Sequence, residues 1–237
     1  MLRRGKYAFV MIILCTAIIL LCHGGSWVVS VFSLNTIREH QYKIIVDPGH
    51  GGMDGGATSC TGKLESSFNL EIAMRLRDLC HLLGYQTRMT RTTDMSTYTH
   101  GETIAAQKLS DLRERVRIAN ASPNAILVSI HQNIFSDSKY SGAQVFYGTS
   151  DGSKLLAESL QSAFVTSLNP GSKRMAKEAD GIYLMEQIQV PGVLVECGFL
   201  SNPAEEAKLR TAEYQKKLCC VIAASVADFI ERGYANT

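Results

Sequence analysis

The sequence lacks the cysteine patterns of a disulfide framework or of a cysteine zinc site. It contains seven cysteines in 237 residues, none of them in a Cys-x-x-Cys pair. Strong charge of either sign is also missing, because the formal net charge is only +2. This balance gives no electrostatic reason to expect a nucleic acid or an acidic partner. We find no internal repeat and no low-complexity tract, which argues against repeat and fibrous architectures.

The composition that remains is that of an ordinary globular protein, with 46% hydrophobic and 19% charged residues. The N-terminus differs from the rest, because basic residues at positions 3, 4 and 6 precede an uncharged apolar run at 7–22. That run is short for a full membrane span, which needs about 20 apolar residues. It fits a signal peptide, or a membrane anchor extended by residues 27–34.

We therefore expect residues 1–36 to be a signal peptide or membrane anchor with a short linker, and residues 41–237 to be the catalytic domain. The basic flank would stay in the cytoplasm, so the remainder would be exported. No convincing Ala-x-Ala cleavage site follows the apolar run, which favours an anchor over a cleaved signal. A buried core helix is the alternative interpretation of this run.

Hydrophobic periodicity predicts an alternation of strands and helices. Strands are expected at apolar runs bounded by turn signals or polar residues, namely 43–46, 85–90, 125–130, 143–147 and 193–195. Helices are expected at 66–83, around 112–119 with Ser110-Asp111 as caps, at 155–168 and at 214–230. This order predicts a single α/β domain with a mostly parallel, twisted sheet covered by helices on both faces.

Three polar residues directly follow predicted strands: His50, His131 and Glu196. Sites in open α/β sheets lie beyond the carboxyl ends of the strands, so we expect these side chains at one rim. Imidazole nitrogens and carboxylate oxygens are zinc ligands, and three protein ligands leave a fourth position for water. A second carboxylate is then needed to move the proton.

The strand-end pattern alone leaves a structural role open, because a histidine at a strand end is more often structural than a ligand. The glycine-rich segment Asp47–Gly56 favours a ligand role for His50, since glycine permits positive φ and close backbone approach. A phosphate-binding loop is excluded because no Gly-Lys-Ser/Thr follows. We interpret Asp47 and Asp54 as residues that shape this loop or support the ligands. The remaining histidines are expected on the surface or in packing: His23, His40, His81 and His100.

Six blocks occur in order along the chain: DPGHGGMDGGA, KLESSFNLEIAMRL, MTRTTD, LRERVRIAN, VSIHQN and PGVLVECGFLSNPAE. In order and spacing they resemble the zinc-dependent N-acetylmuramoyl-L-alanine amidases, over nearly all of residues 42–230. The resemblance implies Zn²⁺ held by His50, Glu65 and His131, with Glu196 as catalytic acid/base. Without it, Glu65 would be read as a first-turn glutamate that complements the helix dipole. Here Leu64 precedes Glu65, where the family block usually has lysine.

The resemblance implies an exported hydrolase that cleaves the amide between N-acetylmuramic acid and L-Ala of peptidoglycan. The hydrophobic leader and single domain are most similar to the CwlD type of spore formers, which acts on spore cortex and prepares the muramic-δ-lactam. It also implies extracytoplasmic action, membrane contact through the N-terminal segment, a location such as the forespore intermembrane space, and a partner protein that activates some relatives. A zinc peptidase or carboxypeptidase acting within the stem peptide, or a non-catalytic peptidoglycan-binding module, are the alternatives.

Other residues of these blocks carry secondary expectations. Asn133 lies two residues past His131, so a strand-like segment would put both on one side, where Asn133 could orient substrate or support the ligands. Arg91 and Arg115 are expected in structural pairing, with substrate contact as the alternative. Cys197 has no evident base and an adjacent glutamate that would raise its pKa, so we interpret it as structural rather than nucleophilic.

Overall fold

One six-stranded sheet organises the part of the chain that the computed structural model describes, residues 42–233. The predicted leader at 1–36 lies outside the described residues. The strand order is β2-β1-β3-β6-β4-β5, and only the β4–β6 pair is antiparallel. The strands are β1 (Lys43–Pro48), β2 (Gln86–Met89), β3 (Ala125–Asn133), β4 (Gln144–Tyr147), β5 (Lys177–Glu178) and β6 (Gly192–Phe199).

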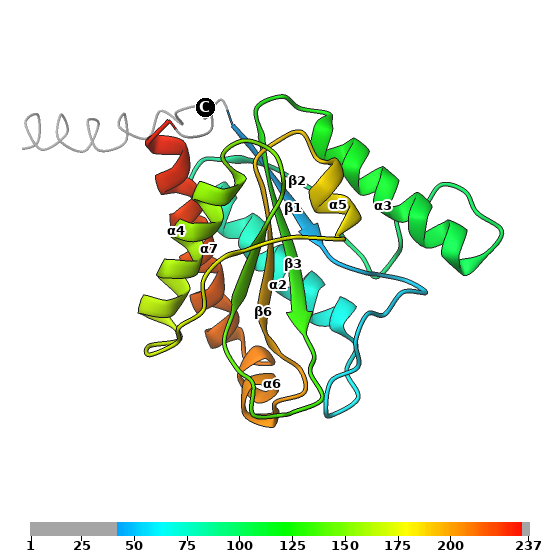
Figure 1. The fold of residues 1–237 in the computed structure, drawn as a ribbon. Helices are drawn as coiled ribbons and strands as arrows, with labels where there is room; N and C mark the ends of the chain where they lie inside the picture. Colours follow the sequence, from blue (N-terminus) through cyan, green and yellow to red (C-terminus); the bar gives the residue numbers. More distant parts are fainter. Residues whose placement is uncertain (1–41, 234–237) are drawn as a thin grey trace, which may run out of the picture. The chain divides into compact units, whose positions relative to one another are not determined.

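Helices cover both faces of this sheet (Figure 1). They are α2 (Glu65–Leu82), α3 (Ile104–Asn120), α4 (Ser153–Ser167), α5 (Tyr183–Gln187), α6 (Pro203–Leu209) and α7 (Ala212–Glu231). Helices α2, α4 and α7 pack together on one face, whereas α3 and the short α5 lie on the other. None of the helices within residues 42–233 has the length and apolar character needed to cross a membrane.

Side-chain alternation along the central strands divides the core into two layers. In β1, Ile44 and Val46 belong to the layer under α2, α4 and α7, whereas Ile45 belongs to the layer under α3 and α5. All three are essentially inaccessible to solvent, so each contributes about 1.5–3 kcal/mol of hydrophobic free energy. This two-sided burial explains why β1 is an uninterrupted apolar run rather than an alternating one.

The predicted fold class, a single α/β domain with a mostly parallel sheet, is confirmed. The predicted caps of the helix expected around 112–119 are wrong: α3 begins at Ile104, and Thr103 caps it by accepting a hydrogen bond from the Ala106 N–H. Asp111 lies inside this helix instead, where its carboxylate accepts from the Thr97 N–H. Helices α5 and α6 were not expected, because segments of five and seven residues are too short to show periodicity.

A buried ion pair joins the sheet to α3. Arg115, which is 2% exposed, donates through Nη1 to Asp47 Oδ1 at 2.5 Å. Asp47 also accepts hydroxyl hydrogen bonds from Thr90 and Ser129. Burial acts to raise the pKa of Asp47, but Arg115 and the two hydroxyl donors outweigh it and lower the pKa. The carboxylate therefore stays ionised and links β1, β3, α3 and the residue after β2.

Replacing Arg115 by alanine should lower the free energy of unfolding by about 3–5 kcal/mol, because Asp47 would remain buried without its cationic partner. The matched control is Arg117→Ala on the same helix, whose side chain is 62% exposed and pairs with Glu114 at the surface. That change should leave the free energy of unfolding nearly unchanged, because exposed ion pairs contribute little. Urea unfolding of both variants measures the difference, and equal losses would contradict a dominant role for the buried pair.

Candidate metal centre

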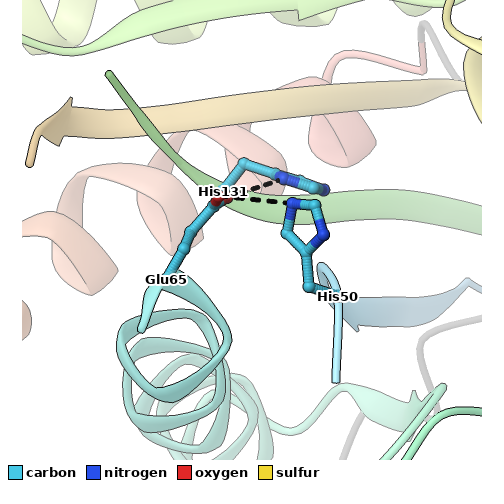
Figure 2. A group of neighbouring side chains, drawn as sticks. All are labelled: His50, Glu65 and His131. Atoms are coloured by element: carbon cyan, nitrogen blue, oxygen red, sulfur yellow. Dashed lines mark hydrogen bonds and ion pairs between the residues drawn. The ribbon is translucent and has the colours of Figure 1, made fainter. Parts of the chain in front are cut away.

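Three side chains from separate elements converge at the carboxyl-end rim of the sheet (Figure 2). His50 lies in the loop after β1, Glu65 is the first residue of α2, and His131 lies in β3. One potential ligand atom from each residue lies within 4.8 Å of the other two. The imidazole rings meet edge to face, with centroids 4.9 Å apart. Among residues 42–233, His50, Glu65 and His131 are the group of side chains whose arrangement could hold a metal ion.

The Glu65 carboxylate lies between the two histidines. Oε1 is 3.0 Å from Nδ1 of His131, and Oε2 is 3.3 Å from Nε2 of His50. Backbone N–H groups of Gln132 and Ala57 and the Asn69 amide also donate to this carboxylate. Burial acts to raise the pKa of Glu65, but the hydrogen bonds and charges of His131 and His50 overcome it and hold the pKa far below its usual range. The side chain is therefore an anion with a fixed orientation, as a metal ligand requires.

His50 is oriented from behind by a carboxylate. Its Nδ1 lies 3.0 Å from Asp54 Oδ2, which leaves Nε2 facing Glu65. Asp54 in turn pairs with Lys108 Nζ of α3 at 3.1 Å. Burial acts to lower the pKa of His50, but Glu65 and Asp54 raise it to about 9. A carboxylate on the far nitrogen is the usual arrangement that fixes the tautomer of a metal-binding histidine.

Two glycines of the loop leave space for the ligand side chains. A Cβ added to Gly49 would lie 2.1 Å from Nε2 of His131. A Cβ added to Gly56, where φ is 66°, would lie 2.6 Å from Oε2 of Glu65 and 2.7 Å from Cδ2 of His50. Gly49 and Gly56 of the DPGHGGMDGGA block are therefore required by contact with the ligand side chains themselves.

Glu196 lies directly beside His131, because the two are register partners in the parallel pair β3–β6. Its Oε2 atom is buried and has no hydrogen-bond partner. Burial raises the pKa of Glu196 to about 7, with Glu65 acting in the same direction and the two histidines against it. This carboxyl group is thus able to exchange a proton near neutral pH.

The expectation that His131 and Glu196 follow the ends of their strands is wrong in detail. Strand β3 continues to Asn133 and β6 continues to Phe199, so both residues lie inside paired strands. The apolar pattern stops at these positions because their side chains face the site, whereas the backbone pairing does not stop. Only His50 lies in a loop beyond its strand.

The structure also places the three block residues that were expected to support the site or to be structural: Asn133, Arg91 and Cys197. Asn133 follows a β-bulge and pairs with Phe199. Arg91 is buried, and its guanidinium donates to the carbonyls of Pro48, Gly49, Ser66 and Thr93, so it supports the His50 loop. Cys197 is fully buried, and burial raises the pKa of its thiol well above the usual value, which does not suit a nucleophile.

Two supporting residues were not identified from the sequence. Asn69 lies one turn after Glu65 and donates to both Glu65 Oε1 and the Gly49 carbonyl. Gln132 donates from its side-chain amide to Asn69 at 3.2 Å. The available signal was an amide residue inside the predicted helix 66–83 and another just after the predicted strand 125–130, because amide side chains require hydrogen-bond partners when they are buried.

The donor set fits a zinc ion. Ligand atoms about 2.0–2.2 Å from a tetrahedral zinc lie about 3.3–3.6 Å from one another. His50 Nε2 lies 3.3 Å from Oε2 of Glu65 and His131 Nδ1 lies 3.0 Å from Oε1, which is close to this spacing, and one ligand atom from each residue lies within 4.8 Å of the other two. A cavity of 220 Å³ opens beside the two histidines, with apolar walls that include Ile182, Leu184 and Leu194. The site therefore has three ligands on one side and open space on another.

Comparison with known proteins agrees with this geometry. Residues 44–228 match the family model described as N-acetylmuramoyl-L-alanine amidase. The germination-specific N-acetylmuramoyl-L-alanine amidase of Bacillus subtilis (strain 168) is 40% identical over 194 residues, which cover 80% of this chain and 81% of that protein.

Solved structures show the same likeness. The CwlD amidase from Clostridioides difficile, solved in complex with the GerS lipoprotein, aligns with a TM-score of 0.76 and 35% identity over 80% of this chain and 98% of that one. An N-acetylmuramoyl-L-alanine amidase from Clostridium difficile 630 aligns with a TM-score of 0.71 and 31% identity over 81% and 98% of the two chains.

The chain therefore belongs to the N-acetylmuramoyl-L-alanine amidase family, and it is a peptidoglycan amidase. Within that family it is similar to the germination-specific, CwlD-type amidases, which confirms the resemblance drawn from the sequence blocks.

Replacing Gly56 by alanine should weaken zinc binding about 10- to 100-fold, because the new methyl group would displace Glu65 and His50. Gly62→Ala is the matched control, since Gly62 also has positive φ, 90°, but has nothing within 4 Å of the added Cβ. Both variants should carry the same backbone strain of about 1–2 kcal/mol. Competition with a chromogenic chelator measures affinity, and equal zinc affinities would contradict the steric explanation.

Proposed function

We propose that this protein is a zinc-dependent hydrolase that cleaves the amide between N-acetylmuramic acid and L-Ala of the peptidoglycan stem peptide. The observation that carries the proposal is the convergence of His50, Glu65 and His131, with the unpartnered Oε2 of Glu196 beside them. Two neutral imidazoles and one carboxylate would hold the ion, and these three ligands together carry a charge of −1. A zinc ion so held supplies Lewis-acid chemistry, polarising the scissile carbonyl and making water more acidic.

Glu196 is proposed to move the proton. Its Oε2 has no competing hydrogen bond, so this atom is available to accept a proton from the attacking water. The same oxygen then delivers the proton to the departing alanine nitrogen, which leaves as an amine. Asp54 keeps Nδ1 of His50 occupied, so that Nε2 remains the ligand atom. The apolar walls of the adjoining cavity limit the access of bulk water to the reacting groups.

We further propose a role in spore-cortex maturation, where removal of stem peptides precedes formation of the muramic-δ-lactam. The similarity to a germination-specific amidase supports this role. Peptidoglycan lies outside the cytoplasmic membrane, so the enzyme would act there, with the N-terminal segment as signal or anchor. The C. difficile relative was solved with a lipoprotein bound, which supports a partner protein for this chain as well.

The test is muropeptide mass analysis of digests by the wild type, Glu196→Gln and a chelated sample. The wild type should free N-terminal L-Ala and leave the glycan intact. Glu196→Gln should lower kcat by about 10²- to 10⁴-fold while keeping one zinc per chain, because the glutamine cannot transfer the proton. Chelation should abolish cleavage, and added zinc should restore it. Products cut within the stem peptide would instead identify a peptidase.

In the zinc-loaded enzyme, the rate should rise with pH and level off below about pH 7. Burial raises the pKa of Glu196 to about 7, and a base is active only when deprotonated, so activity is lost as the pH falls through that pKa. A bound dication would lower this pKa, which moves the acidic limb below 7. The measurement is kcat/KM against pH, with zinc content determined at each point. If the rate of fully zinc-loaded enzyme decreased as the pH rose from 5 to 7, the role of Glu196 as base would be contradicted.

A further inference from the structure

Two aromatic rings lie exposed on the loop that joins β3 to β4. Phe135 is 50% exposed and Tyr140 is 40% exposed. Their centroids are 4.8 Å apart in an edge-to-face arrangement, and Tyr140 lies 6.2 Å from the buried ring of Phe199 with a tilt of 31°. We call Phe135, Tyr140 and Phe199 the aromatic shelf. Clustered apolar groups facing solvent usually mark a binding surface rather than random exposure.

The backbone of the shelf is held rigidly from below. Glu205 of α6 is buried, and its two carboxylate oxygens accept from the N–H groups of Gly142 and Phe199 at 2.7 and 2.8 Å. In Figure 1 the β3–β4 connection passes beside α6 at the lower end of the view. The turn before α6 holds the two exposed residues, since Ser201 Oγ accepts from Phe135 N–H at 3.1 Å and Asn202 Nδ2 donates to the Tyr140 carbonyl at 3.3 Å. The exposed rings are thus preorganised, which lowers the entropic cost of binding.

The shelf lies next to the catalytic groups along the same two strands. His131 pairs with Glu196, and the next pair after the bulge is Asn133 with Phe199. Phe199 is three residues beyond Glu196, a distance of about 10 Å along a strand. The shelf therefore begins three residues along β6 from the proposed acid/base, at the next backbone pair between β3 and β6.

Cationic and polar groups surround the rings. The guanidinium carbon of Arg174 lies 5.1 Å from the Phe199 ring centroid, and Lys139 Nζ, which also pairs with Asp137, lies 5.4 Å from that of Tyr140. A polar hollow of 490 Å³ adjoins the shelf and includes Asn169. An amino sugar has an apolar ring face that can stack on an aromatic ring, and hydroxyl and acetamido groups that can bond to amide side chains. The polymer that carries this sugar also bears carboxylates, which cationic side chains attract.

We propose that the aromatic shelf binds a sugar ring of the glycan strand adjacent to the muramic acid whose amide is cleaved. The inference rests on the proposed function, because only a polymeric substrate continues past the reacting sugar. Exposed aromatic residues also occur at protein interfaces. The glycan is favoured because the shelf adjoins Glu196 along β6, where a bound strand must pass.

The test compares two substrates: glycan strands of several disaccharides carrying stem peptides, and a single disaccharide with its stem peptide. In Tyr140→Ala and Phe135→Ala, the ratio of kcat/KM on strands to that on the disaccharide should fall about five- to tenfold. Tyr140→Phe keeps the ring and should keep the ratio. Leu83→Ala, at the C-cap of α2, is the matched control, because Leu83 is an apolar residue with a similar exposure of 46%, and it should leave both rates unchanged.

A second measurement avoids turnover. Glu196→Gln protein should co-sediment with purified insoluble peptidoglycan, and adding Tyr140→Ala should weaken the apparent Kd about five- to tenfold. If the wild type cleaves neither substrate, the proposed function fails. If it cleaves both and the shelf variants leave the ratio and the Kd unchanged, the shelf proposal is overturned while the function stands. If the shelf variants kept the ratio of kcat/KM on strands to that on the disaccharide but no longer bound a partner protein, the shelf would be a protein interface and the glycan proposal would be overturned.

Discussion

Two buried guanidinium groups determine the conformation of the turn on which the site depends. Arg115 donates to the carbonyls of Pro48 and His50, and Arg91 donates to those of Pro48 and Gly49. Each carbonyl left unpaired in this interior would cost about 1–3 kcal/mol. His50 adopts φ of 60°, the one positive value at a non-glycine residue between 42 and 233. Such a conformation persists only where its surroundings determine it fully, and here the two arginines provide that constraint.

The same centre holds two glutamates in opposite protonation regimes. Glu65 receives donors at both oxygens and stays ionised. Glu196 has a buried oxygen without a donor, and its pKa rises to about 7. Identical side chains therefore suit different tasks, one as a permanent anion and the other as a proton carrier. This division of roles by environment is a common property of catalytic carboxylate pairs.

The fold class and much of the site followed from the sequence because their signals are local. Buried runs such as 43–46 and 125–130 marked the strands, and the polar residues after them marked the rim. Glu65 carries no such signal: it begins a helix on the opposite face, and only the tertiary arrangement brings its carboxylate to the histidines. The family resemblance supplied it. The true length of β6 was also hidden, because Glu196 interrupts the apolar pattern but not the pairing.

The short helix α5 has a consequence for the shape of the domain. Its residues Leu184 and Met185 share a core layer with Leu194 in β6, and Glu196 lies two positions further along that strand. Because Ile182 and Leu184 at its N-terminal end form one wall of the cavity, the starting point of this helix sets how far the cleft reaches into the sheet. A helix of only five residues thus bounds this side of the opening, while α3 and the His50 loop bound the others, so a change in the length of α5 would reshape one wall and leave the metal ligands in place.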